Sequence, residues 1–296
     1  MVAILIAHGE DRNMTDDWLE DVTEQLIPTS LGLINVRTGG RADGPAMVCW
    51  PSLMMDGTMW RHQYEHFAPT HRLVLVDSPG HGTSDALRRI IDLKDCSDVL
   101  VEILDALGID RCVLVGNSWG GMLAGVFPAY HPRRTIAAVG INCTASLPTT
   151  FESIWATALA TFLSLHSTMP PLAAKAARAA FAGPTAEATN PEFLDFTRFV
   201  LRDDPKSVAW ALRSILIGRA DEHRRLNTIR DTPVLILAGE EDSQFPVHVV
   251  RKMADAIEGS TFRVLRNTAH LAARENPEAV NAEIDRFLST LPAAVR

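Results

Sequence analysis

Apolar residues along the chain follow two alternating patterns. Unbroken runs, such as LVLV at residues 73–76, predict strands buried on both faces, as in a parallel sheet covered by helices. Other stretches have helical spacing; residues 97–107 carry apolar side chains at positions 100, 103, 104 and 107. Because the two kinds of segment alternate, the sequence predicts an α/β fold with a mostly parallel, doubly wound sheet.

The boundaries of these elements follow from turn residues such as Gly108, which ends the helix before it. Pro128 is expected to kink its helix or end it early, and Asn276 with Pro277 should start the last helix. The predicted strands cover residues 31–37, 46–50, 72–77, 111–116, 135–141, 233–239 and 261–266, and the predicted helices cover residues 97–107, 118–130, 247–257 and 277–291.

The alternation stops between residues 143 and 230. This stretch has no convincing strand but has helical patterns, whereas a crossover between parallel strands needs only about a dozen residues. We therefore expect a helical insertion over residues 143–230 in a core formed by residues 31–142 and 231–296. Its helices are predicted over residues 151–165, 171–181, 191–201 and 205–217.

Residues 1–30 show the weakest pattern and are interpreted as an N-terminal extension. Within them, Trp18, Val22 and Leu26 recur every four residues, which predicts a short amphipathic helix over residues 16–27.

Composition narrows the class of function. The net charge of −8 argues against a nucleic-acid partner, since phosphate binding requires clustered Lys and Arg. The four cysteines form no C-x-x-C pair and are interpreted as buried thiols, so no metal site is predicted. No apolar run reaches the roughly 18 residues of a membrane span, and the first residues lack the pattern of a signal peptide. We expect a cytoplasmic protein without a membrane partner; a homo-oligomer is compatible with the sequence.

The sharpest chemical motif is Gly-Asn-Ser-Trp-Gly at residues 116–120, which matches G-x-S-x-G between a predicted strand and a predicted helix. In this context Ser118 sits on a tight turn that points its hydroxyl out at the carboxyl edge of the sheet. Glycines two residues before and after leave room for the crossing backbone. The sequence therefore predicts Ser118 as a nucleophile.

A serine nucleophile needs a base, and the base needs a partner that holds its tautomer. Of the ten histidines, His270 follows the strand predicted at residues 261–266 and so lies at the carboxyl edge of the sheet. Asp242 follows the strand at residues 233–239 and lies at the same edge. Glu240 and Glu241 precede it directly and are alternatives to Asp242 on position alone.

The order serine, acid, histidine resembles the α/β-hydrolase family. Residues 77–84 (DSPGHGTS) look like the family's segment ahead of the nucleophile. Residues 237–246 (LAGEEDSQFP) are similar to its acid loop, and residues 267–277 (NTAHLAARENP) to its histidine loop. The resemblance implies an α/β-hydrolase fold, a serine hydrolase without a cofactor, and a helical insertion that caps the site. It also favours Asp242 over the two glutamates.

The chain departs from the family at the oxyanion loop. Where the family usually has His-Gly after the third strand, residues 50–53 read Trp-Pro-Ser-Leu, and Pro51 has no N–H to donate. Alignment back from Trp60 places Leu53 at the donor position, with Ser52 as the alternative. The resemblance gives Trp119, the residue after the nucleophile, as the second donor.

The leading hypothesis is hydrolysis of a small-molecule carboxylic ester through an acyl-enzyme. The same triad could act on an enol-lactone or a carbon–carbon bond, and a non-enzymatic ligand receptor on the same fold is an alternative of another class. Ser118 argues against epoxide hydrolysis, for which the family has aspartate at this position. Six aromatic residues of the insertion could line an acyl pocket or pack its own core: Trp155, Phe162, Phe193, Phe196, Phe199 and Trp210.

Overall fold

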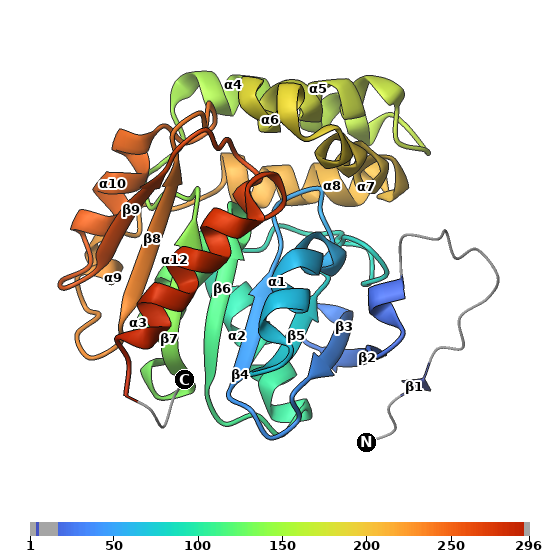
Figure 1. The fold of residues 1–296 in the computed structure, drawn as a ribbon. Helices are drawn as coiled ribbons and strands as arrows, with labels where there is room; N and C mark the ends of the chain where they lie inside the picture. The colour runs from blue at the N-terminus through green and yellow to red at the C-terminus, as the bar shows by residue number, and fades with distance from the viewer. Residues whose placement is uncertain (1–3, 6–16, 293–296) are drawn as a thin grey trace.

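A computed structural model describes residues 4–5 and 17–292 and contains a nine-stranded sheet (Figure 1). Its order is β1-β2-β3-β5-β4-β6-β7-β8-β9; the pairs from β5 to β9 are parallel, and β1, β2 and β3 pair antiparallel at one edge. The predicted α/β fold with a mostly parallel sheet is confirmed. The strands are β1 (Ile4–Leu5), β2 (Thr23–Thr29), β3 (Gly32–Gly40), β4 (Ala46–Trp50), β5 (Arg72–Val76), β6 (Cys112–Asn117), β7 (Thr135–Ile141), β8 (Val234–Gly239) and β9 (Thr261–Leu265).

The helix predicted over residues 16–27 is wrong for the part that the structure describes. A 3-10 turn, η1 (Asp17–Leu19), is followed by β2, which pairs with β3 over its whole length. The four-residue apolar spacing was a weak signal, whereas Pro28 disfavours a helix and cross-strand pairing buries Ile27. Residues 23–29 of the predicted extension therefore belong to the sheet.

Helices cover both faces of the sheet. Helix α12 lies across the front of the sheet in Figure 1 and contacts α1, while α2 and α3 pack against each other and α3 contacts β6 and β7. The Asn276 side chain caps α12, as predicted, whereas Pro128 lies inside α3 without ending it. The helices of the core are α1 (Arg61–Phe67), α2 (Leu93–Ala106), α3 (Trp119–Tyr130), α10 (Val247–Asp255), α11 (Ala272–Glu275) and α12 (Pro277–Ser289), with 3-10 turns η2 (Gly57–Trp60) and η3 (Pro132–Arg134).

Residues 143–230 contain helices and no strand, as predicted, and in Figure 1 most of them lie above the sheet. Two of the four predicted helices are divided: residues 191–201 into a 3-10 turn and an α-helix, and residues 205–217 into an α-helix and a π-helix. The elements are α4 (Thr150–Ser164), α5 (Pro171–Phe181), α6 (Pro184–Thr189), η4 (Pro191–Phe196), α7 (Thr197–Arg202), α8 (Pro205–Ala211), η5 (Leu212–Ile217, the π-helix) and α9 (His223–Leu226).

Side chains of this insertion are tied to the core loop that follows β5. The Ser207 hydroxyl donates to the Gly80 carbonyl oxygen at 2.9 Å and accepts from the Leu87 N–H at 2.8 Å. The Asp203 carboxylate accepts from the Gly82 N–H at 3.2 Å. These bonds hold the helical insertion over one end of the sheet.

The core is apolar throughout the central strands. Every residue of β4, β6 and β8 is buried, as expected for a sheet covered on both faces. All four cysteines are buried and free, which confirms the interpretation made from their spacing. In the part of the chain that the structure describes, no helix combines the length and apolar character needed to cross a bilayer.

Candidate active site

Ser118 stands on the sharp turn that the motif predicts. β6 ends at Asn117 and α3 begins at Trp119, so Ser118 alone makes the turn, with φ 55° and ψ −111°. A non-glycine residue in this region is strained, and such strain concentrates at functional sites. The flanking glycines are required by close backbone approach: a Cβ on residue 116 would lie 2.0 Å from the oxygen of Gly120, and a Cβ on residue 120 would lie 2.0 Å from the oxygen of Trp50.

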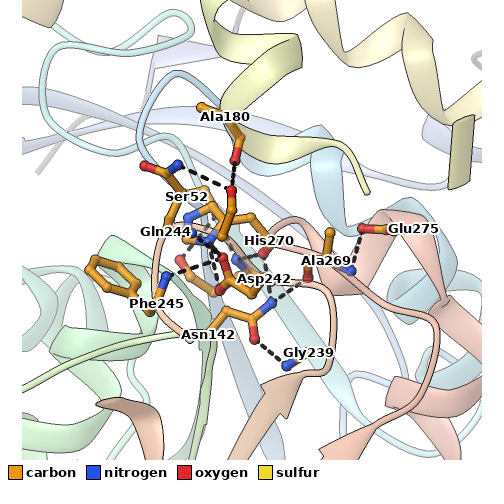
Figure 2. Close-up of polar contacts among 12 residues, drawn as sticks. Ser52, Asn142, Ala180, Gly239, Asp242, Gln244, Phe245, Ala269, His270 and Glu275 are labelled. Carbon is orange, nitrogen blue, oxygen red and sulfur yellow. Dashed lines mark hydrogen bonds and ion pairs between the residues drawn. The ribbon is translucent and has the colours of Figure 1, made fainter. Parts of the chain in front are cut away.

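His270 and Asp242 meet at the carboxyl edge of the sheet (Figure 2). The His270 Nδ1 atom lies 3.0 Å from both carboxylate oxygens of Asp242, and both side chains are buried. The N–H groups of Gln244 and Phe245 also donate to Asp242, at 2.8 and 3.2 Å. A carboxylate held in this way can orient the imidazole with its proton on Nδ1.

The two rival glutamates have other contacts. Glu240 accepts from the Asn267 N–H at 3.1 Å, and Glu241 accepts from the Thr185 N–H at 3.1 Å and its hydroxyl at 2.5 Å. Thr185 lies in the helical insertion, so Glu241 joins the acid loop to that insertion.

One pocket brings together four of the five predicted site residues: Ser118, His270, Leu53 and Trp119 line it, and Asp242 supports His270. The rest of its wall is mainly apolar and comes partly from the helical insertion. Phe181 at the end of α5 is stacked on the His270 ring, with ring centres 5.1 Å apart and an interplanar angle of 24°. The helical insertion therefore directly contacts the imidazole.

The backbone N–H groups predicted as oxyanion donors differ in the hydrogen bonds that they already make. The Ser52 N–H points at the sulfur of Met59 at 3.3 Å, and the Ser52 hydroxyl is engaged with Asn117. Trp119 is the first residue of α3, so its N–H has no partner within that helix. Of the two predicted alternatives, Leu53 but not Ser52 lines the pocket.

Two asparagines hold the histidine loop: Asn117, which ends β6, and Asn142, which follows the neighbouring strand β7 and is labelled in Figure 2. The Asn142 amide donates to the carbonyl oxygens of Ala269 at 2.6 Å and His270 at 2.9 Å, and its oxygen accepts from the Gly239 N–H at 2.6 Å. Asn117 donates to the same His270 oxygen at 2.9 Å. Sequence reasoning did not single out Asn142; the available signal was a polar residue directly after the apolar run of β7.

We expect Asn142→Ala to lower the free energy of unfolding by about 2–4 kcal/mol, because it removes three buried hydrogen bonds and leaves the Ala269 carbonyl and the Gly239 N–H without their side-chain partner, while the His270 carbonyl keeps only its bond from Asn117. Asn142 has φ 48°, so the loss of its bonds must be separated from backbone strain. Asn142→Gly serves as the matched control, since glycine adopts this φ freely. Urea unfolding of both variants is the measurement; wild-type stability in Asn142→Gly would contradict a role for the three hydrogen bonds.

Glu275 is a second buried carboxyl behind the histidine loop. One oxygen accepts from the Ala269 N–H at 2.9 Å, and the other has no hydrogen-bond partner among the described residues. Burial, opposed in part by the Ala269 N–H and reinforced by nearby Glu241 and Asp242, raises the pKa of Glu275 from 4.5 to about 7. Between these values the folded protein keeps a proton that the unfolded chain has lost, so this group lowers stability as pH rises through that window.

The variant Glu275→Gln mimics the protonated side chain and should abolish this contribution. We expect its Tm to exceed that of wild type by a few degrees at pH 8 and to match wild type at pH 4, where the carboxyl is protonated in both states. Thermal unfolding at the two pH values is the measurement. An equal Tm difference at both would show that ionisation of Glu275 is not its cause.

The predicted aromatic residues divide unequally between pocket and core. Of the six, only Trp155 is among the described residues that line the pocket; Phe193 and Phe196 are buried and pack against each other with their rings tilted by 36°. The aromatic rings beside His270 are Phe181 and Phe245, which sequence reasoning missed. Phe181 ends a predicted helix and Phe245 lies in the acid loop, and no local pattern marks either as facing a pocket.

Comparison with known proteins gives the class of the chain. A family profile with the description "alpha/beta hydrolase fold" matches residues 45–277. The chain therefore belongs to the α/β-hydrolase fold family and is an α/β-hydrolase enzyme. A thermophilic esterase from Thermogutta terrifontis has the same fold, with a TM-score of 0.81 at 23% identity over 91% of this chain and 98% of that one.

Two curated relatives differ in how much of the chain they match. The 3-oxoadipate enol-lactonase 1 of Acinetobacter baylyi is 28% identical over 246 residues, 83% of this chain and 89% of that protein. Epoxide hydrolase 4 of Mus musculus is 40% identical over only 86 residues, 28% of this chain, so the match spans about a quarter of the length of that relative.

Proposed function

We propose that this chain is a serine hydrolase acting on small-molecule carboxylic esters, with Ser118 as nucleophile, His270 as general base and Asp242 as the group that orients His270. The observation that carries the proposal is that Ser118, on a strained turn, lines the same pocket as His270. The Nδ1 atom of His270 lies 3.0 Å from the Asp242 carboxylate, which leaves Nε2 for the proton of Ser118. An imidazole paired in this way is suited to take a hydroxyl proton.

In the first half of the proposed reaction, the Ser118 oxygen attacks the ester carbonyl carbon and its proton passes to Nε2 of His270. The N–H groups of Leu53 and Trp119 would bind the oxyanion, and their place in the pocket lining supports this assignment. When the bond between carbonyl carbon and alcohol oxygen breaks, His270 protonates the departing alkoxide.

In the second half, water attacks the acyl-enzyme carbonyl while His270 accepts a water proton. The tetrahedral intermediate then releases the carboxylic acid, and the proton on His270 returns to the Ser118 oxygen. These steps require no cofactor.

We further infer that residues 143–230 act as a cap over the site. Phe181 and Trp155 of this segment line the pocket, and Thr185 bonds to the acid loop through Glu241. A cap in this position would keep bulk solvent out of the pocket while the substrate binds and would select substrates by shape.

Hydrolysis of an enol-lactone is the second candidate. A lactone is a cyclic ester, so attack by Ser118 and proton transfer by His270 would be unchanged. The observation in its favour is the match to 3-oxoadipate enol-lactonase 1 over 83% of this chain.

Pre-steady-state hydrolysis of 4-nitrophenyl acetate and 4-nitrophenyl butyrate tests the proposal. We expect a burst of nitrophenolate close to one equivalent of enzyme, followed by slower turnover, because an acyl-enzyme is formed before water releases the acid. An absence of both burst and turnover for these esters would count against an ester hydrolase.

A further inference from the structure

The pocket has an apolar wall and no fixed charge beyond the proposed catalytic pair. Among the described residues that line it, none is Lys, Arg, Asp or Glu. Its cap side is formed by alanine, leucine and aromatic side chains, and the uncharged amide of Gln244 lies on the acid-loop side. A substrate group that binds in this pocket is transferred from water to an apolar environment.

Arg219 and Arg213 lie near the pocket, but their guanidinium groups bind other protein groups. Arg219 lies 5.6 Å from the ring centre of Phe245, but its guanidinium pairs with Glu152 at 2.9 Å and donates to the Ser146 carbonyl oxygen at 2.9 Å. Arg213, next to pocket-lining Leu212, donates to the Ser164 hydroxyl at 2.9 Å and lies over the ring of Trp210. Neither lines the pocket, so neither guanidinium faces a bound substrate.

The electrostatic setting also disfavours an anion. Asp242 lies directly behind His270 and is buried, so a carboxylate in the pocket would meet a second negative charge without a compensating cation. Burial of an unpaired carboxylate is costly because protein groups do not replace its hydration. Apolar chains gain free energy at the same place through burial against leucine and aromatic side chains.

We infer that the substrate of this site is an uncharged ester or lactone with an apolar acyl group, and that the pocket selects against acyl groups that carry a carboxylate. The inference rests on the proposed hydrolase function and narrows its substrate class. It disfavours lactones and carbon–carbon substrates derived from dicarboxylic acids. Trp155 lines the pocket and is 41% exposed, so the apolar surface extends from the pocket to solvent, where a longer acyl chain can follow it.

Three esters with six-carbon acyl chains separate charge from size. They are 4-nitrophenyl hexanoate, mono-4-nitrophenyl adipate, and the methyl ester of the latter, which restores neutrality with added bulk. We expect the hexanoate and the methyl ester to be hydrolysed with kcat/KM values at least about 100-fold higher than that of the free adipate. Fluorophosphonate labelling of Ser118 is measured in parallel.

The outcomes distinguish this inference from the proposed function. Labelled Ser118 with equal or faster hydrolysis of the free adipate would overturn the inference and leave the serine mechanism intact. Labelling without turnover of any of the three esters would also overturn it. If Ser118 is not labelled and none of the three esters is hydrolysed, both the inference and the proposed function are overturned.

A charge introduced on the cap side gives an independent test. Leu159 lines the pocket from α4 and is only partly buried, so Leu159→Arg can be accommodated more readily than a change in the core. The quantity compared is kcat/KM for mono-4-nitrophenyl adipate divided by kcat/KM for 4-nitrophenyl hexanoate. We expect Leu159→Arg to raise this ratio by about tenfold or more relative to wild type, whereas the neutral control Leu159→Met should leave it within about twofold. An unchanged ratio in a folded Leu159→Arg protein would contradict the inference.

Discussion

Ser118→Ala is expected to lower kcat for ester hydrolysis by about 10⁴-fold or more while leaving the protein folded. Among the described residues that line the pocket, Ser118 carries the only hydroxyl or thiol side chain. Loss of the serine in comparable triads leaves only the contribution of the oxyanion donors and of substrate binding. Alanine adopts the φ of 55° with the same difficulty as serine, so the change removes the hydroxyl without adding strain.

Steady-state hydrolysis of 4-nitrophenyl butyrate by wild type and Ser118→Ala, with Tm measured on the same samples, checks this expectation. Because binding does not depend on the hydroxyl, KM should change far less than kcat. Retention of more than a tenth of the wild-type kcat by a folded Ser118→Ala protein would mean that another group attacks the ester.

The second large effect is expected for Asp242→Asn, which should lower kcat by about 10³–10⁴-fold. The amide that replaces the carboxylate can donate to Nδ1 of His270, at the position now 3.0 Å from the carboxylate. That bond would favour the proton on Nε2, the atom that must accept the proton of Ser118. The variant would therefore hold the imidazole in the unproductive tautomer.

The adjacent glutamates provide matched controls. Glu240→Gln and Glu241→Gln remove the same charge from the same loop, yet these residues bond to Asn267 and Thr185 instead of His270. We expect both to keep kcat within about threefold of wild type in the same assay. A loss in either control as large as that in Asp242→Asn would indicate a general effect of loop charge rather than a specific contact with His270.

Strands β3 to β9 and helices α2, α3, α10 and α12 could be predicted because apolar runs, helical spacing and turn residues mark them locally, whereas α1 and α11 were not predicted. The runs that became β5, β6 and β8 are buried on both faces, so their composition alone distinguishes them from half-exposed strands. β2 was missed because its stability depends on pairing with β3, which no local pattern in residues 23–29 reveals.

The candidate site could be predicted to the extent that its residues lie in motifs at strand ends. Ser118, Asp242 and His270 follow three different parallel strands, and the topology brings these ends to one edge. Phe181 and Asn142 were not predicted, since their roles depend on how the helical insertion and the loops pack in three dimensions. A helical pattern shows that a residue faces an interior, but not which interior it faces.

The most direct test of the proposed serine mechanism is covalent labelling with a fluorophosphonate, followed by mass-spectrometric mapping of the modified peptide. The proposed mechanism predicts a single phosphonylated residue, Ser118, with labelling abolished in Ser118→Ala and strongly slowed in Asp242→Asn. Labelling of another residue, or equal labelling of wild type and Ser118→Ala, would contradict it.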